Sequence, residues 1–195
     1  MRSGQSFDPL ALYTPTGDFI DNGDGTATHR KTGLMWKRCA EGQTWSGSAC
    51  LGRAAAYDWS TAVTLSSSSA GYNDWRLPTA NELLTIVEYQ SFRPAINATI
   101  FPNFSNSPTS AFWSASENDG YGSAGAWGVN FNDGYVSSDY KYYGYAYQVR
   151  LVRAGQLFGI WGFAAQAAVA PNVAIVSNAL KVAGISGATP IAIVG

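Results

Sequence analysis

The sequence predicts an α+β fold in which short strands and loops dominate and helices are few. Charged residues make up only 13% of the 195 residues while 46% are apolar, a balance that favours a loop-rich β globule over a helical bundle. Seven Trp, eleven Tyr and 21 Gly agree with this, because aromatic side chains suit strands and glycine suits turns. Two segments with helical patterning supply the α component.

The first element is predicted to be a hairpin over Asp18 to Trp36. A turn cluster, Asn22-Gly23-Asp24-Gly25, follows Phe19-Ile20-Asp21, and β-branched residues then lead to Leu34-Met35-Trp36. The acidic and amide residues of this turn also suggest a calcium loop, but the distal Glu of an EF-hand is missing. A plain turn is therefore favoured, and no metal site is expected.

Two helices are predicted in the middle of the chain. Ala54 to Leu65 carries Ala55, Trp59, Ala62 and Val63 at helical spacing. Further on, Thr79-Ala80-Asn81-Glu82 matches a capping box, in which the Thr and Glu side chains satisfy each other's backbone N–H groups. The second helix is expected to run from there to about Tyr89.

Three short strands are predicted after the helices, at Ala111 to Ala115, Ala126 to Phe131 and Ala146 to Val152. The last strand alternates, with Tyr147, Val149 and Leu151 on one face and Arg150 on the other. We expect the apolar faces to form the core, with Trp36, Trp75, Trp113 and Trp127 mostly buried.

The composition changes after Arg153. From Ala154 to Gly195 the only charged residue is Lys181, and three runs are strand-like: Val173–Val176, Leu180–Val182 and Ile191–Val194. This piece is too short to bury a core of its own. The chain is therefore divided into a main domain, residues 1–155, and residues 156–195, which form either a β-strand-like extension or the start of a further module.

The cysteines and the charge balance bear on location and partners. Cys39 and Cys50 flank a short polar loop and are expected to form a disulfide in an oxidising, exported setting; the alternative is two free thiols in a reducing compartment. Two Cys and one His are too few for a Cys/His zinc site, and no cofactor is expected. No apolar segment follows Met1-Arg2-Ser3-Gly4, so no signal peptide is predicted, and no run is long enough for membrane insertion. A net charge of −1 argues against nucleic-acid binding.

Five motifs in order resemble one protein family. The sequence resembles the C-terminal domain of collagen-like bacterial adhesins, which is related to the C-type-lectin fold of formylglycine-generating enzymes. The resemblance covers about residues 18 to 155 and implies two helices packed on a small irregular antiparallel β core. The matching pieces are Asp21-Asn22-Gly23-Asp24-Gly25-Thr26, Thr32-Gly33-Leu34-Met35-Trp36, Asn73-Asp74-Trp75-Arg76-Leu77-Pro78-Thr79, Phe112-Trp113-Ser114-Ala115-Ser116 and Val149-Arg150-Leu151-Val152-Arg153.

A second resemblance concerns the Tyr-, Ser-, Gly- and Asp-rich stretch from Asp119 to Tyr145. It resembles the variable region of proteins diversified by a retroelement, in which template adenines are copied unfaithfully and AAC codons become NNC. Tyr, Ser, Asp and Gly are all reachable in this way, and they concentrate just before the last predicted strand of the domain. Lys141 departs from the pattern and is interpreted as an unmutated template residue.

The same stretch is predicted to be a binding surface on physical grounds. Tyr offers a large contact area with few rotatable bonds, Ser and Gly make adaptable loops, and antibody paratopes use this mixture. So many Tyr hydroxyls cannot all be satisfied in a core. The alternative is a Tyr-rich strand surface without a ligand. The expected ligand-binding residues are Asp119, Tyr121, Tyr135, Ser137, Ser138, Asp139, Tyr140, Tyr142, Tyr143, Gly144 and Tyr145.

The sequence therefore favours a non-catalytic module that binds an unknown protein or glycan on another cell or virion surface, with an extracellular, cell-surface or virion location. An enzyme of the formylglycine-generating type needs cysteines in the central cleft, whereas both cysteines here lie early in the chain. Lone His29, within Thr28-His29-Arg30-Lys31, is expected to be solvated, and no Gly-x-Ser-x-Gly elbow is present. The alternative is an adhesin-type carbohydrate-binding domain without diversification.

Overall fold

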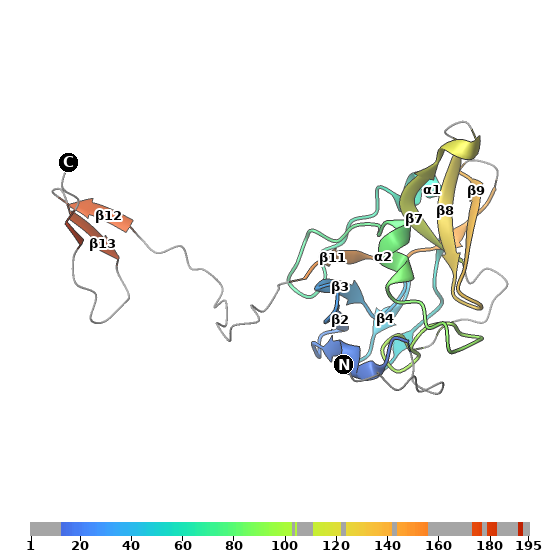
Figure 1. Cartoon of the computed structure of the whole chain (residues 1–195), viewed down its shortest axis with the longest axis horizontal. Helices are drawn as coiled ribbons and strands as arrows, with labels where there is room; N and C mark the ends of the chain where they lie inside the picture. Colours follow the sequence, from blue (N-terminus) through green and yellow to red (C-terminus); the bar gives the residue numbers. More distant parts are fainter. Residues whose placement is uncertain are drawn as a thin grey trace, which may run out of the picture. The chain divides into compact units, whose positions relative to one another are not determined.

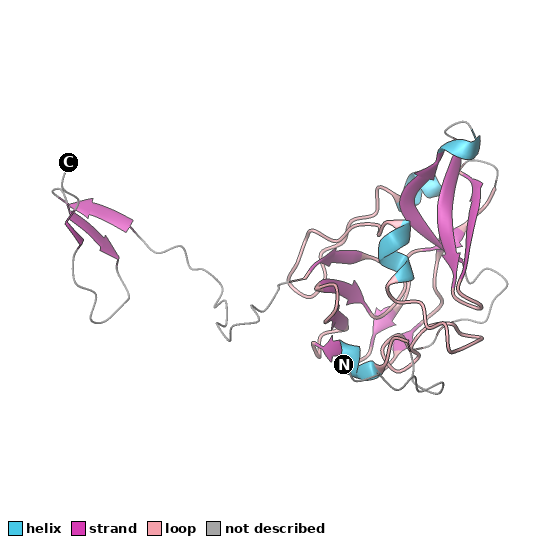
Figure 2. Ribbon diagram, in the orientation of Figure 1, coloured by secondary structure: helices cyan, strands magenta, loops and turns pink. Residues whose placement is uncertain are grey.

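The computed structural model describes residues 13–102, 104, 111–121, 124–141 and 144–155, and three strands at 173–176, 179–182 and 191–192. By its internal contacts the chain divides into two compact units, Met1–Gln156 and Leu157–Gly195. The described part of the first unit contains short strands, two short α-helices and two 3-10 turns, which confirms the α+β class (Figures 1 and 2).

A four-stranded antiparallel sheet follows the 3-10 turn η1 (Thr16–Asp18). Its order is β1 (Phe19–Asp21), β2 (Thr26–His29), β3 (Leu34–Lys37) and β11 (Val152–Ala154). The predicted hairpin is thus a three-stranded meander, because a second turn, closed by the Gly33 N–H on the His29 carbonyl, reverses the chain again. In the first turn Asp21 and Asp24 each accept a backbone N–H, from Gly23 and Thr26.

The five-stranded sheet has the order β6 (Ala56–Tyr57), β10 (Tyr147–Gln148), β7 (Ala111–Asn118), β8 (Gly125–Asn130) and β9 (Tyr135–Tyr140). Only β10 and β7 run parallel. The longest strands, β7, β8 and β9, lie side by side, and η2 (Asp119–Tyr121) follows the end of β7 (Figure 1). β7 is longer than predicted, and β9 was not predicted as a strand.

Both helices are shorter than the sequence pattern predicts. The capping box of Thr79 and Glu82 is confirmed at the start of α2 (Ala80–Leu84), but the helix ends at Leu84 and Val87 instead bridges to Ile96. The first helix, α1, spans only Trp59–Ala62 and is capped by Asp58. Residues 56 and 57, expected to be helical, are instead drawn into the sheet as β6.

The predicted strand Ala146–Val152 is divided between two sheets. β10 ends at Gln148, β11 begins at Val152, and the intervening residues cross from one sheet to the other. Their backbone carbonyls accept N–H groups from the end of β3 and the segment after it: Leu151 from Lys37, and Val149 from Glu41. Arg150 lies over the Phe101 and Phe112 rings, whereas Val149 and Leu151 pack with Trp113, so the two predicted faces are present and both are buried.

The five-stranded sheet separates two hydrophobic clusters. Adjacent residues on a strand point to opposite faces, and Phe112 of β7 belongs to one cluster whereas Trp113 belongs to the other. Trp36, Trp75 and Trp113 are buried as predicted, while Trp127 is only partly buried. The first cluster includes Trp36, Leu83, Ile86, Val87, Phe101, Phe112, Val129 and Phe131, and the second includes Trp59, Trp75, Leu77, Trp113, Ala126, Val149 and Leu151.

A disulfide joins Cys39 to Cys50, with the two Cα atoms 5.4 Å apart. It ties the segment after β3 to a small hairpin of β4 (Thr44–Trp45) and β5 (Cys50–Leu51). In the second unit, β12 (Val173–Val176), β13 (Ala179–Val182) and β14 (Ile191–Ala192) form a three-stranded antiparallel sheet; each overlaps a run that the sequence predicted as a strand, and β13 begins one residue earlier than predicted.

Replacement of Trp75 tests the second cluster. Trp75 is 2% exposed and its indole N–H donates to the Ser69 carbonyl, so Trp75→Ala leaves a large cavity and removes one hydrogen bond. We expect a loss of about 3–5 kcal/mol in the free energy of unfolding, measured by urea denaturation. Phe92→Ala is the control, because Phe92 is 66% exposed and should change stability by no more than about 0.5 kcal/mol. Equal effects of the two substitutions would contradict this packing.

Candidate binding surface

The Tyr-rich stretch forms the outer strand of the five-stranded sheet rather than a loop. Among the described strands β9 pairs with β8 alone, and the register places Tyr140 opposite Gly125, Ser138 opposite Trp127 and Tyr135 opposite Asn130. One long side of the strand is therefore the edge of the sheet, as β9 shows in Figure 1. An edge strand presents its side chains and part of its backbone to an incoming partner.

Five of the predicted ligand-binding residues lie on this strand: Tyr135, Ser137, Ser138, Asp139 and Tyr140. Tyr135 is 66% exposed, Tyr140 39% and Tyr145 43%. Asp119 and Gly144 are also exposed, whereas Ser137, Ser138 and Asp139 are half-buried. Tyr142, Tyr143 and the side chain of Tyr121 lie outside the described residues.

The surface is not the single face that the sequence suggested. Strand alternation places Tyr135, Ser137 and Asp139 on one side of the sheet, and Ser138 and Tyr140 on the other. The correction has a simple cause: the residues were expected to form one contiguous patch, whereas a strand points successive side chains to opposite faces. A ligand that contacts the side chains on both faces must therefore wrap around the free edge of β9.

On one side of β9, Tyr147 reaches across the sheet from β10. Its ring stacks on Trp113 with 4.3 Å between ring centroids, and its hydroxyl donates to the Asp139 carboxylate. Burial and the contact with Asp139 raise the pKa of Tyr147. Gly128 leaves room for the ring, because a Cβ at this position would lie 3.4 Å from it and 3.0 Å from the Phe112 carbonyl oxygen. Asp139 therefore holds the framework as well as lining the surface.

Lys141 has a framework role that its sequence context did not reveal. The residue is 3% exposed, its ammonium lies 2.7 Å from the Glu117 carboxylate, and the same group sits 4.4 Å from the Trp59 ring centroid. Its backbone N–H donates to the Ala124 carbonyl. Lys141 thus anchors the end of β9 to β7 and α1, which gives a structural reason for a lysine among Tyr, Ser, Gly and Asp.

His29 is not solvated as expected. It is 3% exposed, stacks on Phe19 with 4.8 Å between ring centroids, and its Nδ1 lies 3.0 Å from the Thr32 hydroxyl. β2 carries it inward because all four residues of that strand are buried.

One protein-family model matches the chain. The model of the Lcl C-terminal domain matches residues 25–153, more than half of the sequence. The chain belongs to the Lcl C-terminal domain family. The matched span of this Lcl C-terminal domain includes β2 to β11, and therefore β9 and its anchors. The match supports the class of variable proteins of diversity-generating retroelements. No curated protein and no solved structure matches the chain.

Two further observations concern the described residues of the Lcl C-terminal domain. None of the helices in this part of the chain has the length and apolar character needed to span a membrane. No cluster of three or more His, Cys, Asp or Glu side chains in these ranges is arranged to hold a metal ion.

The anchoring role of Lys141 can be separated from an ordinary surface ion pair. Lys141→Ala removes a charge-assisted hydrogen bond from a buried position, so we expect the free energy of unfolding to fall by about 1.5–3 kcal/mol. Lys31→Ala is the matched control, because Lys31 pairs with Asp18 at the same 2.7 Å but its side chain is 61% exposed. That change should cost no more than about 1 kcal/mol. Chemical denaturation of both variants measures the difference, and a Lys141 variant as stable as the Lys31 variant would show that no anchor exists.

Proposed function

We propose that the domain is a non-catalytic recognition module that binds a protein or glycan ligand with β9 and the exposed residues flanking it. The observation that carries this proposal is an edge strand with exposed tyrosines at both ends, Tyr135 and Tyr140. Tyr147 and Lys141 hold this strand in place through their contacts with Asp139 and Glu117. Exposed aromatics on a rigid support are typical of binding hot spots, because little entropy is lost when they engage.

The division between exposed and anchored residues suits a surface that varies. Substitutions at exposed positions usually change stability by about 0.5 kcal/mol or less, so Tyr135 and Tyr140 can be exchanged without unfolding the domain. The anchors are set apart from them: Lys141 is buried, and Tyr147 lies on a different strand. This arrangement supports diversification of β9 by a retroelement.

The remaining parts of the proposal concern fold and location. We assign the domain to the C-type-lectin fold, supported by the two short helices beside an irregular sheet and by the motifs shared with collagen-like adhesins. A disulfide between Cys39 and Cys50 agrees with an extracellular position, on a cell or virion surface. The ligand then lies on an opposing cell or virion, and the proposal involves neither catalysis nor nucleic acid.

Array screening of the full chain tests the binding surface. We expect a protein or glycan ligand whose affinity falls about 30-fold or more, equivalent to about 2 kcal/mol, when Tyr135 and Tyr140 are both changed to Thr. Thr keeps the strand propensity of the positions. Phe92→Ala is the control, because Phe92 is an aromatic with the same 66% exposure as Tyr135 but lies outside β9. Binding that survives in the double variant, or arrays without any ligand, would refute the proposed surface.

The gene tests diversification separately. We expect a nearby template repeat, accompanied by a reverse transcriptase gene, in which the codons for Tyr135, Ser137, Ser138, Asp139 and Tyr140 align with AAC codons. The Lys141 codon should be the same in the template and the gene, because Lys141 is an anchor. Sequencing the locus decides this. A locus with neither template nor reverse transcriptase would leave an adhesin-type carbohydrate-binding domain without diversification.

A further inference from the structure

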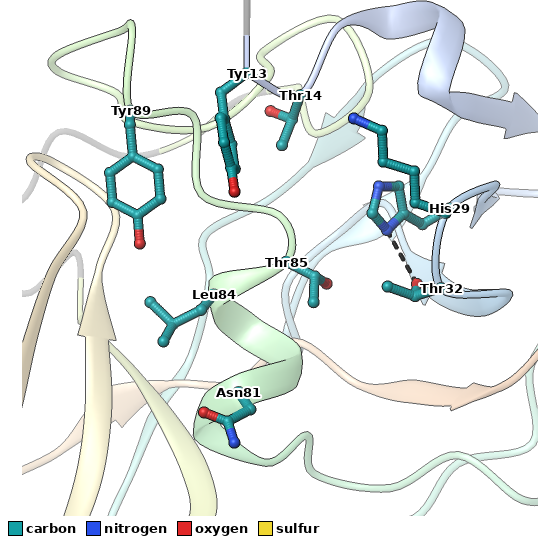
Figure 3. Close-up of a pocket in the computed structure, with 9 residues that line it drawn as sticks. Tyr13, Thr14, His29, Thr32, Asn81, Leu84, Thr85 and Tyr89 are labelled. Atoms are coloured by element: carbon teal, nitrogen blue, oxygen red, sulfur yellow. Dashed lines mark hydrogen bonds between the residues drawn. The ribbon is translucent and has the colours of Figure 1, made fainter. Parts of the chain in front are cut away.

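A second candidate site lies away from β9, in a cavity of about 340 Å³ beside α2. Three segments enclose it: Tyr13 and Thr14 near the N-terminus, the end of β2 with the turn that follows, and α2 with Tyr89 beyond it. Figure 3 shows Leu84 and Tyr89 on one side of the cavity, and His29 and Thr32 on the other. A volume near the lower end of the usual range for ligand pockets, roughly 300–1,000 Å³, suits one small ring rather than an extended chain.

Two tyrosines make an aromatic wall at this cavity. The rings of Tyr13 and Tyr89 meet edge to face with 5.4 Å between centroids, and the residues are 58% and 55% exposed. Both are held in place. Glu88 accepts hydrogen bonds from the backbone N–H groups of Tyr13 and Thr14, and the turn at Gly134 approaches the Tyr89 ring so closely that a Cβ there would lie 3.5 Å from it.

The opposite wall contains a buried polar atom without a partner. His29 is 3% exposed, its Nδ1 contacts the Thr32 hydroxyl, and its Nε2 has no hydrogen-bond partner among the described residues. A buried polar group of this kind costs free energy unless something bonds to it. Burial lowers the pKa of His29, an effect that Asp18 opposes and Lys31 reinforces, so the ring is neutral at pH 7.

The charge of the cavity excludes an ionic ligand. The one ammonium in its lining, that of Lys31, is already 2.7 Å from the Asp18 carboxylate. The other polar lining groups are the hydroxyls of Thr14, Thr32, Thr85 and the tyrosines, and the amide of Asn81. An anion would therefore find no uncompensated cation, and a cation would find no carboxylate in the lining.

We propose that this cavity binds one uncharged sugar ring, as a free monosaccharide or as the terminal unit of a glycan. The C–H face of the ring stacks on Tyr89, with Tyr13 against the edge of the sugar, and its hydroxyls bond to Thr85, Asn81 and His29 Nε2. A hydroxyl both donates and accepts, so it satisfies Nε2 whichever imidazole nitrogen carries the proton. A flat aromatic ligand would pack on Tyr89 equally well but would leave His29 Nε2 without a partner.

This site is independent of the surface proposed on β9. None of the β9 residues of that surface lines the cavity, although Tyr89 lies beside the β8–β9 turn at Gly134 and α2 packs on β8. Loss of binding at one site can therefore be measured while the other is intact.

The test uses the full chain and the neutral methyl glycosides of glucose, galactose, mannose and N-acetylglucosamine as probes, with benzyl alcohol and glucose 6-sulfate as the aromatic and anionic comparisons. Saturation-transfer NMR detects binding, and the ¹⁵N resonances of the His29 imidazole report whether the ligand lies beside His29. We expect millimolar binding of at least one neutral glycoside, with a shift of the Nε2 resonance. If no methyl glycoside binds by itself but an oligosaccharide ending in the same sugar does, the natural ligand is the terminal unit of a glycan.

Variants make the assignment specific. Thr85→Val keeps the side-chain shape and removes one acceptor, and Tyr89→Ala removes half of the aromatic wall; each should weaken glycoside binding about tenfold or more. Tyr135→Thr should leave it unchanged, even if that variant loses its array ligand. No binding of any neutral glycoside or of its oligosaccharides, preference for the sulfate or for benzyl alcohol, or binding that persists in both cavity variants would overturn the proposal.

Discussion

The buried guanidinium of Arg150 is the contact on which the arrangement of the two main sheets depends. It donates to the carbonyls of Lys37 and Arg38 at the end of β3, and it lies near the rings of Phe101 and Phe112, 4.7 and 5.4 Å from their centroids. Burial lowers the pKa of this group, but a guanidinium stays charged in proteins, so carbonyl dipoles and aromatic faces must replace its lost hydration. One charge therefore joins the crossing segment, the end of the four-stranded sheet and the first core cluster.

The position of β9 follows from this junction through a chain of neighbours. The segment that carries Arg150 connects β10 to β11, β10 pairs with β7, and β7 pairs with β8, which alone carries β9. The outer strand is thus three steps from the residues that hold the sheets together. Changes at Tyr135 or Tyr140 reach none of those contacts, whereas Tyr147, next to the junction, reaches back over Gly128 to support Asp139. The exposed tyrosines of β9 and the contacts that hold the sheets together therefore lie in different parts of the sheet.

Features that depend on residues close together in the sequence could be predicted, whereas features that depend on long-range contacts could not. The capping box of Thr79 and Glu82 was predicted because both partners lie within one turn, and Val173–Val176 was predicted as a strand from its composition. Residues 56 and 57 have helical patterning, but pairing with β10 overrides it. The exposure of Tyr135 and Tyr140 was predicted from the residue types of the stretch, yet its strand character depends on pairing with β8. Lys141, Tyr147 and His29 could not be assigned their roles, since Glu117, Asp139 and Phe19 become their neighbours only after folding.

An edge strand that accepts many side chains must also avoid pairing with copies of itself. Exposed, flat edges promote aggregation, and natural proteins counter this with charges and irregularities near the edge. Here a register shift between Trp113 and Glu117 distorts β7 beneath the hairpin, Asp139 places a carboxylate in β9, and Lys141 ends the strand with its side chain turned into the core. Lys141 therefore fixes the end of β9 against Glu117 and Trp59, and it ends the exposed part of the strand. A recognition surface on an edge strand needs such an end point, because a longer exposed edge would pair more readily with other copies of the protein.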